Sequence, residues 1–367
     1  MLRVIDLTTL TGAYAARLFA EQGHEVIRVE APEGDEIRKL PPFLKNCEDL
    51  EHGAFHQFLN AGKKSITLDF ELPDERERFL DLLSAADLLI ANSPLPVHER
   101  ECRGVNPKLV LIKIVDDAPE ICAAARSGLM ALTGHPGKTP FVLGAHIPSM
   151  AVATYVAVAA AAALLVRNAS QQGLTSAVSV RRSLESFVEQ AMVEYCFSGI
   201  ITDRRGGKGA ITAVSGALPC KDGHWVISQI HRSGRWSKFM EWVKDEELNA
   251  DPSLAEEENQ HKRRDFIMER LRIWANRFTK AELVDEAQRR HFPASPVSTP
   301  LDLVDDPQLL ARGFLTEIDH PAFGKIHFPQ GAVASIAGTV LRPAPRLGEH
   351  NQVILSRRAP ATTQAPQ

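Results

Sequence analysis

The stretch RVIDLTTLTGAYAARLFAEQGHEVIRVE, from Arg3 to Glu30, decides the fold. RVIDLT is a short apolar run typical of a strand, and the segment from Gly12 to Glu21 has the spacing of an amphipathic helix. HEVIRVE predicts a second strand that ends on an acid. A strand, a helix and another strand in this order are typical of the βαβ unit that opens a Rossmann-like domain.

Further strands are predicted along the next part of the chain, at Ser65 to Leu68, Asp87 to Ile90 and Leu109 to Ile114. Helical segments such as Leu72 to Ala86 separate them. This alternation predicts an α/β fold, in which a parallel sheet carries helices on both faces.

A Rossmann-like opening also raises the question of a dinucleotide site, in which Glu30 would bind a ribose hydroxyl. LTTLTGAYA supplies one glycine where the pyrophosphate fingerprint needs three, so the stretch does not predict such a site. His52 and His56 are four residues apart, but Gly53 weakens the helix that would align them and no third ligand is apparent. No metal site is predicted.

The composition indicates an ordinary globular protein. The 367 residues are enough for two domains, and 44% of them are hydrophobic. A net charge of −4 favours neither nucleic acid nor an anionic membrane as a partner. The five cysteines form no CxxC pair, which indicates reduced thiols in a cytoplasmic protein. Met150 to Val166 is uncharged but alanine-rich and short for a bilayer, so we expect a buried helix and no membrane span.

The second half of the chain changes character. A second long helical pattern covers Ser183 to Ile201, and a glycine-rich basic stretch, Arg204 to Gly209, then suggests either a lid over a pocket or a solvated loop. Asp222-Gly223 predicts a hairpin. Helical segments follow at Trp236 to Val243 and His261 to Phe278.

Four segments, taken in order, carry a family resemblance: VEAPEGDEIR (Val29 to Arg38), FLNAGKKSITLDF (Phe58 to Phe70), FPASPVSTPLDLVDDPQLLARG (Phe292 to Gly313) and PAPRLGEHNQVIL (Pro343 to Leu355). Together they resemble the class III CoA-transferase family, which includes formyl-CoA transferase, carnitine CoA-transferase and the α-methylacyl-CoA racemases. The resemblance covers nearly the whole chain. It implies that coenzyme A or an acyl-CoA is a substrate.

The resemblance also implies an architecture. A large Rossmann-like CoA-binding domain would be discontinuous, made of residues 1–205 and 325–358, with a smaller α+β domain inserted at 210–320 and a disordered tail at 359–367. PRLGEHN would close the large domain after the chain returns from the small one. This is a structural role for Glu349 and His350, and the alternative is that they form an acid/base pair. Two chains would form an interlocked homodimer, or a heterodimer with a paralogous subunit.

The resemblance assigns CoA contacts to Thr11, Arg38, Leu68 and Asn92. Arginine suits phosphate because its planar fork makes two charge-assisted bonds at once. The alternative for Arg38 is a surface salt bridge with Asp35 or Glu36. A further basic contact would come from Arg100 or Arg103.

Ser149 stands where the family places a nucleophilic aspartate, in GAHIPSMAVATYVA. The aspartate attacks an acyl-CoA, becomes a mixed anhydride and then carries CoA as a thioester. Serine has no carbonyl carbon that could carry CoA. The racemases pair this aspartate with an upstream histidine, and the matching position here falls near Pro119. No aspartate occurs between Asp117 and Asp203, so a shifted alignment would not restore the nucleophile.

Three interpretations of Ser149 remain open. It caps the alanine-rich helix by accepting bonds from the amides of Met150 to Val152. It is a nucleophile for acyl transfer, activated by His146 as the nearest base in sequence. In the third, the helix N-terminus binds an anionic group through its free amides, and other residues do the chemistry.

The sequence therefore predicts a class III CoA-transferase-like protein that acts on an organic acid or acyl-CoA without the usual aspartyl-CoA thioester. One alternative is an acyl-CoA lyase, isomerase or acyltransferase that has reused the pocket. The other is a non-catalytic subunit paired with an aspartate-bearing paralogue.

Overall fold

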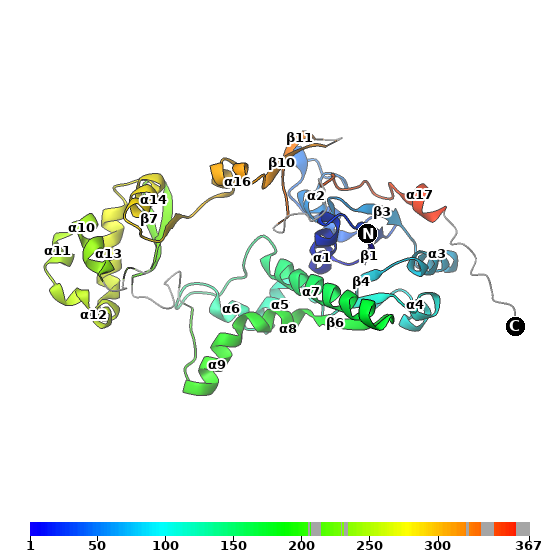
Figure 1. The fold of residues 1–367 in the computed structure, drawn as a ribbon, viewed down its shortest axis with the longest axis horizontal. Helices are drawn as coiled ribbons and strands as arrows, with labels where there is room; N and C mark the ends of the chain where they lie inside the picture. Colours follow the sequence, from blue (N-terminus) through cyan, green and yellow to red (C-terminus); the bar gives the residue numbers. More distant parts are fainter. Residues whose placement is uncertain are drawn as a thin grey trace. The chain divides into compact units, whose positions relative to one another are not determined.

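The structure is a computed structural model that describes residues 1–204, 206, 214–228, 230, 234–320, 323–331 and 341–356 (Figure 1). Its described residues form two compact units. The first draws on Met1–Met130, Val142–Ile200 and Leu310–Gln367, and the second on Ala131–Phe141 and Ile201–Leu309. The predicted small domain, 210–320, overlaps the second unit over most of its length. The predicted tail at 359–367 lies outside the described residues, as does most of the stretch Arg204 to Gly209.

A parallel sheet of six strands forms the centre of the first unit, in the order β3-β2-β1-β4-β5-β6. Its strands are β1 (Arg3–Leu7), β2 (Glu25–Glu30), β3 (Lys64–Thr67), β4 (Leu88–Asn92), β5 (Val110–Val115) and β6 (Thr175–Ser179). The α/β class predicted from the sequence is confirmed. The sequence analysis missed β6, whose sequence TSAVS is mostly small and polar and largely exposed or half exposed at the sheet edge, so it gives little apolar signal.

Both faces of the sheet are covered, because successive side chains on a strand point to opposite faces. Val4 and Leu88 pack with α1 (Leu10–Glu21) and α7 (Ile147–Ser170). Ile5 and Leu89 pack on the other face with α3 (Pro73–Ser84) and α4 (Glu99–Val105). The remaining elements of this unit are η1 (Glu36–Lys39), η2 (Leu44–Asn46), α2 (Ala54–Asn60), α5 (Glu120–Arg126), α6 (Leu129–Leu132), α8 (Val180–Glu185), η3 (Ser186–Val188), α9 (Glu189–Ser198), β10 (Leu315–His320), β11 (Gly324–Pro329) and α17 (Asn351–Leu355).

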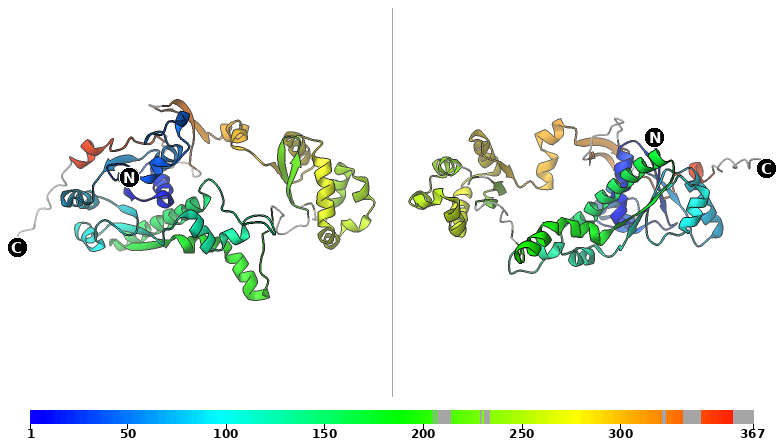
Figure 2. Two further views of the ribbon diagram at one scale, coloured as in Figure 1. Left: turned by 180° about the vertical axis from the view of Figure 1, so that it is seen from behind. Right: turned by 60° about the horizontal axis from the view of Figure 1, so that its bottom comes forward.

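Helix α7 is the alanine-rich helix predicted from the sequence, and it lies along α1 and β5 (Figure 2). By length and composition alone it could cross a membrane. Its small residues let it pack closely on the sheet: Val152, Val156 and Ala160 are fully buried, whereas Val158 and Leu165 on the other side are exposed. The predicted core helix is therefore confirmed for the side that faces the sheet.

The second helical pattern, predicted to run from Ser183 to Ile201, is divided in the structure. Helix α8 ends at Glu185, a single 3₁₀ turn follows, and α9 begins at Glu189. The prediction of one long helix was wrong because the apolar spacing continues through the 3₁₀ turn, where only the backbone hydrogen bonds change.

The second unit combines an antiparallel sheet with a group of helices. Its strands are β7 (Gly216–Cys220), β8 (Gly223–Ile227) and β9 (Ala294–Pro296), and β7 and β8 form the hairpin predicted at Asp222-Gly223. The helices are α10 (Arg235–Val243), α11 (Glu246–Asn249), η4 (Pro252–Ala255), α12 (Glu257–Lys262), α13 (Arg264–Ala275), α14 (Lys280–Arg289) and α15 (Pro300–Val304), with α16 (Pro307–Ala311) at the unit boundary. Trp225, Phe239 and Trp274 form the centre of its aromatic core.

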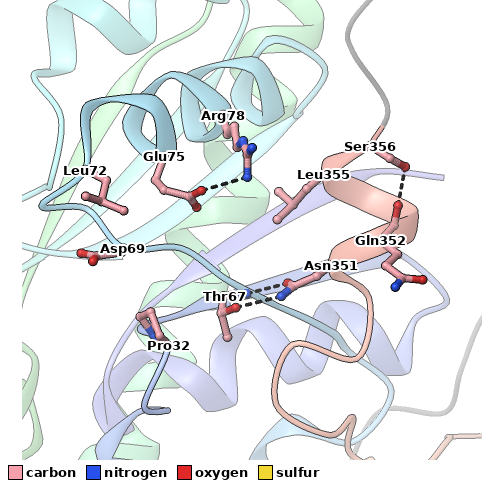
Figure 3. A pocket seen from close by; sticks show the side chains of 10 residues that line it. All are labelled: Pro32, Thr67, Asp69, Leu72, Glu75, Arg78, Asn351, Gln352, Leu355 and Ser356. Carbon is pink, nitrogen blue, oxygen red and sulfur yellow. Dashed lines mark hydrogen bonds and ion pairs between the residues drawn. The ribbon is translucent and has the colours of Figure 1, made fainter.

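The PRLGEHN segment docks onto the edge strand β3. The Gly348 N–H donates to Ser65 Oγ at 3.0 Å, and the His350 N–H donates to the Ser65 carbonyl at 2.9 Å. The Asn351 side chain accepts from the Thr67 N–H and donates to the Thr67 hydroxyl, both at 2.9 Å (Figure 3). The segment therefore pairs with β3 through backbone and amide groups, which supports its structural interpretation.

A cavity of about 600 Å³ lies beside this docked segment (Figure 3). Its walls come from the end of β3, the start of α3 and from α17: Pro32, Thr67, Asp69, Leu72, Glu75, Arg78, Asn351, Gln352, Leu355 and Ser356. Glu75 and Arg78 in its wall form an ion pair at 2.8 Å, so the one arginine there is already neutralised. The cavity contains none of the residues predicted for the site.

Candidate active site

The order of the strands in the sheet predicts where a ligand binds. Strands β1 and β4 lie side by side, yet the helices that follow them, α1 and α4, pack on opposite faces. In an open parallel sheet, this divergence leaves a crevice beyond the carboxyl ends of the two strands, where ligands bind. The residues that follow β1 and β4 are therefore candidates for ligand contact.

Thr11 and Asn92, two of the predicted CoA contacts, come together beyond the carboxyl ends of β1 and β4, where the topology predicts this crevice. The Thr9 N–H donates to Asn92 Oδ1 at 2.8 Å. Asp117, which follows β5, accepts two hydrogen bonds with its carboxylate. One comes from Asn92 Nδ2, and the other comes from Thr11 Oγ1 at 3.2 Å. Sequence reasoning did not single out Asp117, because an acid in a loop carries no spacing signal. The crevice thus offers hydroxyl and amide groups around an exposed carboxylate.

Two residues that the resemblance named, Leu68 and Arg103, make their contacts within the protein. Leu68 is buried in the core next to Ile66, and its N–H donates to the Glu30 carbonyl at 2.9 Å. A contact between Leu68 and CoA would therefore involve its backbone. The Arg103 guanidinium donates to the Leu109 carbonyl and, at 2.7 Å, to the Thr175 hydroxyl. It ties α4 to the sheet.

Arg38 lies inside the protein, with a side chain that is 0% exposed. Its guanidinium makes two parallel bonds to Glu30, of 2.6 and 2.9 Å, and a third of 2.9 Å to Glu51. Further contacts go to the Leu50 and Pro345 carbonyls, each at 3.3 Å. The alternative of a surface salt bridge with Asp35 or Glu36 was wrong, since the partners are Glu30 and Glu51. In this arrangement the guanidinium has no free edge for a phosphate, and its contact with CoA stays a prediction.

His56 completes this buried cluster as a neutral imidazole. Asn60 Oδ1 accepts from the Lys63 ammonium at 2.9 Å, so Asn60 Nδ2 must donate to His56 Nδ1, at 3.0 Å. His56 Nε2 lies 3.2 Å from the Pro345 carbonyl oxygen and 3.1 Å from Arg38 Nη1. Burial, and next the positive charge of Arg38, lower the pKa of His56 to about 3. This imidazole is therefore a structural group that stays uncharged.

Ser149 lies at the third position of α7 and is buried. Its N–H donates to Glu120 Oε2 at 3.1 Å, and its hydroxyl donates to the same oxygen. The N-cap position belongs to His146, and Ser149 makes no capping bond of its own. The interpretation of Ser149 as a cap is therefore wrong: the residue donates two bonds to a carboxylate that reaches in from α5.

His146 faces the same carboxylate. Its Nδ1 lies 3.4 Å from Glu120 Oε1, and its ring packs edge-on against Phe55 at 4.8 Å between centroids. The single Ser149 hydroxyl proton goes to Glu120, so His146 is not the base that would activate this serine. Glu120 thus lies between the two residues that the sequence named. The sequence did mark this position: Glu120 directly follows Pro119, near which we looked only for the histidine of the racemases.

Glu120 lies against the first turn of a long helix. Helix α7 is 24 residues long, and the Ser149 N–H in its first turn donates to Glu120, at the end where the helix dipole is positive. Glu120 opens α5 three residues after Asp117, so their Cα atoms are at most about 11 Å apart. The Glu120 carboxylate and the group formed by Thr11, Asn92 and Asp117 therefore lie near each other at the carboxyl edge of the sheet.

Comparison with known proteins defines the class. Residues 2–351 match the model of CoA-transferase family III, so the chain belongs to this family. It is 28% identical to succinyl-CoA:mesaconate CoA-transferase of Haloarcula hispanica, over 98% of this chain and 96% of the relative. It is 27% identical to a subunit of succinyl-CoA:(R)-benzylsuccinate CoA-transferase of Thauera aromatica, over 96% and 92%.

The fold is shared with solved structures as well. A CAIB/BAIF family protein from Brucella suis superposes with a TM-score of 0.85 and 25% identity, over 97% of each chain. The family predicted from the four sequence segments is thus confirmed over nearly the whole chain. Named relatives are CoA-transferases, one of them a subunit of a larger assembly.

Proposed function

We propose that this chain binds CoA and acyl-CoA in the crevice beside Thr11 and Asn92, and that it moves CoA from one organic acid to another. One observation supports this proposal above all: Thr11 and Asn92 lie near a carboxylate that is held at the N-terminus of α7, in a chain that belongs to CoA-transferase family III. The proposed transfer runs without the usual aspartyl-CoA thioester, which is supported by the lack of any aspartate between Asp117 and Asp203.

The chemistry of the crevice suggests which part of CoA it would hold. Thr11 and Asn92 are neutral, and Asp117 is acidic and exposed. A carboxylate repels phosphate but accepts hydrogen bonds from amides. The amide-bearing pantetheine arm therefore suits this crevice better than the nucleotide phosphates. This places the thioester end of the substrate toward α7.

Calorimetry with CoA and succinyl-CoA tests the binding step. Wild type should bind, and Asn92→Ala should weaken binding about tenfold, since it removes bonds worth about 1.4 kcal/mol. Asn249→Ala, at the exposed end of α11, is the matched control and should bind like wild type. Absence of binding at millimolar ligand would remove the proposal.

A transfer assay tests the reaction. Succinyl-CoA is the first donor because both relatives act from it by name, and a panel of mono- and dicarboxylic acids serves as acceptors. The expected result is a new acyl-CoA in proportion to succinate released. Free CoA or a rearranged acyl group instead would favour the lyase, isomerase or acyltransferase alternatives.

The assembly belongs to the same proposal. We expect an interlocked homodimer in a cytoplasmic setting, where the five free thiols stay reduced. The relative from Thauera aromatica, a subunit by name, supports a heterodimer with an aspartate-bearing paralogue as the second possibility. Native mass spectrometry of the purified chain distinguishes the homodimer from the heterodimer. If a homodimer is active in the transfer assay, the chain is not a non-catalytic subunit.

A further inference from the structure

We propose that Glu120 is the nucleophilic carboxylate of this protein and that Ser149 positions it. The inference rests on the proposed CoA transfer, whose chemistry needs a carboxylate that can become a thioester. Glu120 Oε2 is held by both the N–H and the hydroxyl of Ser149, the residue at the family's aspartate position. A carboxylate carried by the neighbouring helix, α5, thus reaches the N-terminus of α7.

The contacts of Glu120 are those of a reactive group. Both donors from Ser149 bind one oxygen, Oε2, while Oε1 faces only His146 Nδ1, at 3.4 Å, among its described ion-pair and hydrogen-bond partners. The Glu120 side chain is 19% exposed, so a substrate can approach it. Glu30, by contrast, is 0% exposed and takes its bonds from Arg38 and Ser65. Glu30 has no oxygen to offer a substrate.

The reaction then balances without a cofactor. The Glu120 carboxylate attacks the thioester carbonyl, the C–S bond breaks, and a mixed anhydride and the CoA thiolate result. The thiolate attacks the Glu120 carbonyl carbon, which releases the donor carboxylate and leaves a glutamyl-CoA thioester. The acceptor carboxylate attacks this thioester to give a second anhydride and thiolate, and the thiolate takes the acceptor acyl group. Glu120 is regenerated, and no net proton is gained or lost.

Ser149 has a defined part in these steps. Each attack on the Glu120 carbonyl carbon places negative charge on its oxygen, and two donors already directed at Oε2 stabilise that charge. The N-terminus of α7 adds its partial positive charge. A serine at position 149 is thus useful where an aspartate would be harmful, since a second carboxylate against Glu120 would disfavour ionisation of one of the two.

Variants of Glu120 give the first test. Glu120→Gln should lose at least about 10³-fold in transfer rate, as expected on removing a nucleophile, while calorimetry still shows CoA binding. Glu189→Gln is the matched control, since Glu189 is exposed and also opens its helix, α9, and it should transfer like wild type. Glu120→Asp keeps a carboxylate and should retain a covalent adduct at reduced rate. Retained transfer in Glu120→Gln would overturn this assignment alone and leave the proposed function intact.

Trapping of the intermediate gives the second test. Wild type is mixed with succinyl-CoA, treated with hydroxylamine, digested and analysed by peptide mass spectrometry. A hydroxamate on Glu120 is expected, because hydroxylamine captures the activated carbonyl of an anhydride or thioester. A succinyl group on Ser149 would instead make the serine the nucleophile and Glu120 its base. An enzyme that transfers CoA but carries no modification at Glu120 overturns the proposal.

The positioning role of Ser149 needs its own variants. Ser149→Ala should lower kcat about 10²-fold with little change in KM, because the hydroxyl bond stabilises charge that forms only during reaction. Ser149→Thr keeps a hydroxyl and should restore most of the rate. A rise in KM with unchanged kcat would contradict the role given to Ser149, and so would a Ser149→Thr variant as slow as Ser149→Ala.

Discussion

Two carboxylate clusters of the first unit differ in what surrounds them. The Glu30 and Arg38 side chains are fully buried, and every oxygen of Glu30 has a partner inside the protein. Glu120 at the N-terminus of α7 is partly exposed, and among its described ion-pair and hydrogen-bond partners Oε1 faces only His146 Nδ1, at 3.4 Å. The first cluster ties strands to loops, and the second can still accept a ligand. The comparison teaches that a charged residue is a candidate for chemistry when its bonding capacity is left incomplete.

The energetics follow the same division. A buried charge is costly unless its partners replace water, so removing one partner of such a pair leaves an uncompensated charge. At the open site, water or substrate can replace a lost partner. Stability should therefore respond to changes in the buried cluster, and activity to changes at Glu120.

The largest effect on stability is expected from Arg38→Met. It leaves the Glu30 carboxylate buried without its guanidinium, which should lower the free energy of unfolding by about 3–5 kcal/mol in urea denaturation. Lys39→Met removes the neighbouring exposed ion pair with Glu36 and should leave the urea midpoint almost unchanged, because surface ion pairs contribute little to stability. If Arg38→Met unfolded like wild type but lost CoA binding, Arg38 would belong to the ligand site and the comparison would fail.

Gly12→Ala should have the next largest effect, by crowding the wall of the crevice. A Cβ at Gly12 would lie 2.5 Å from Ile114 Cδ1 and 2.6 Å from Thr8 Cγ2, too close without a shift of α1. Overpacking of this kind costs about 1–3 kcal/mol, which thermal unfolding should show. Gly104→Ala in α4 meets nothing within 4 Å and should be neutral or slightly stabilising. Equal behaviour of the two variants would contradict the close packing of α1.

The smallest effect concerns pH and sharpens the description of the buried cluster. The pKa of His56 is depressed in the folded state to about 3, so below pH 6.5 the unfolded chain binds a proton that the folded chain does not. Between pH 7.5 and 5.5 this histidine should lower the free energy of unfolding by about 1.4 kcal/mol. His56→Gln, which cannot titrate, should show a shallower loss in urea denaturation over that range. An unchanged pH slope would mean that His56 is not kept neutral.

The sequence alone determined the fold class and the family, because both depend on local patterns. The apolar runs at Arg3 to Leu7 and Glu25 to Glu30, and the segments around Arg38 and PRLGEHN, are contiguous and can be recognised without coordinates. The strand β6 and the break between α8 and α9 escaped prediction, since a half-exposed edge strand and a 3₁₀ turn leave the apolar pattern almost unchanged.

The site was decided by tertiary structure. Sequence reasoning identified Ser149 as the exceptional residue, and it identified Thr11 and Asn92, which the sheet topology brings to one crevice. It could not find Glu120, 29 residues before Ser149, because only the packing of α5 beside α7 joins them. It equally could not show that Arg38 is enclosed by Glu30 and Glu51. Bonding partners distant in sequence decide whether a charge supports the fold or reacts, and only the folded chain brings those partners together.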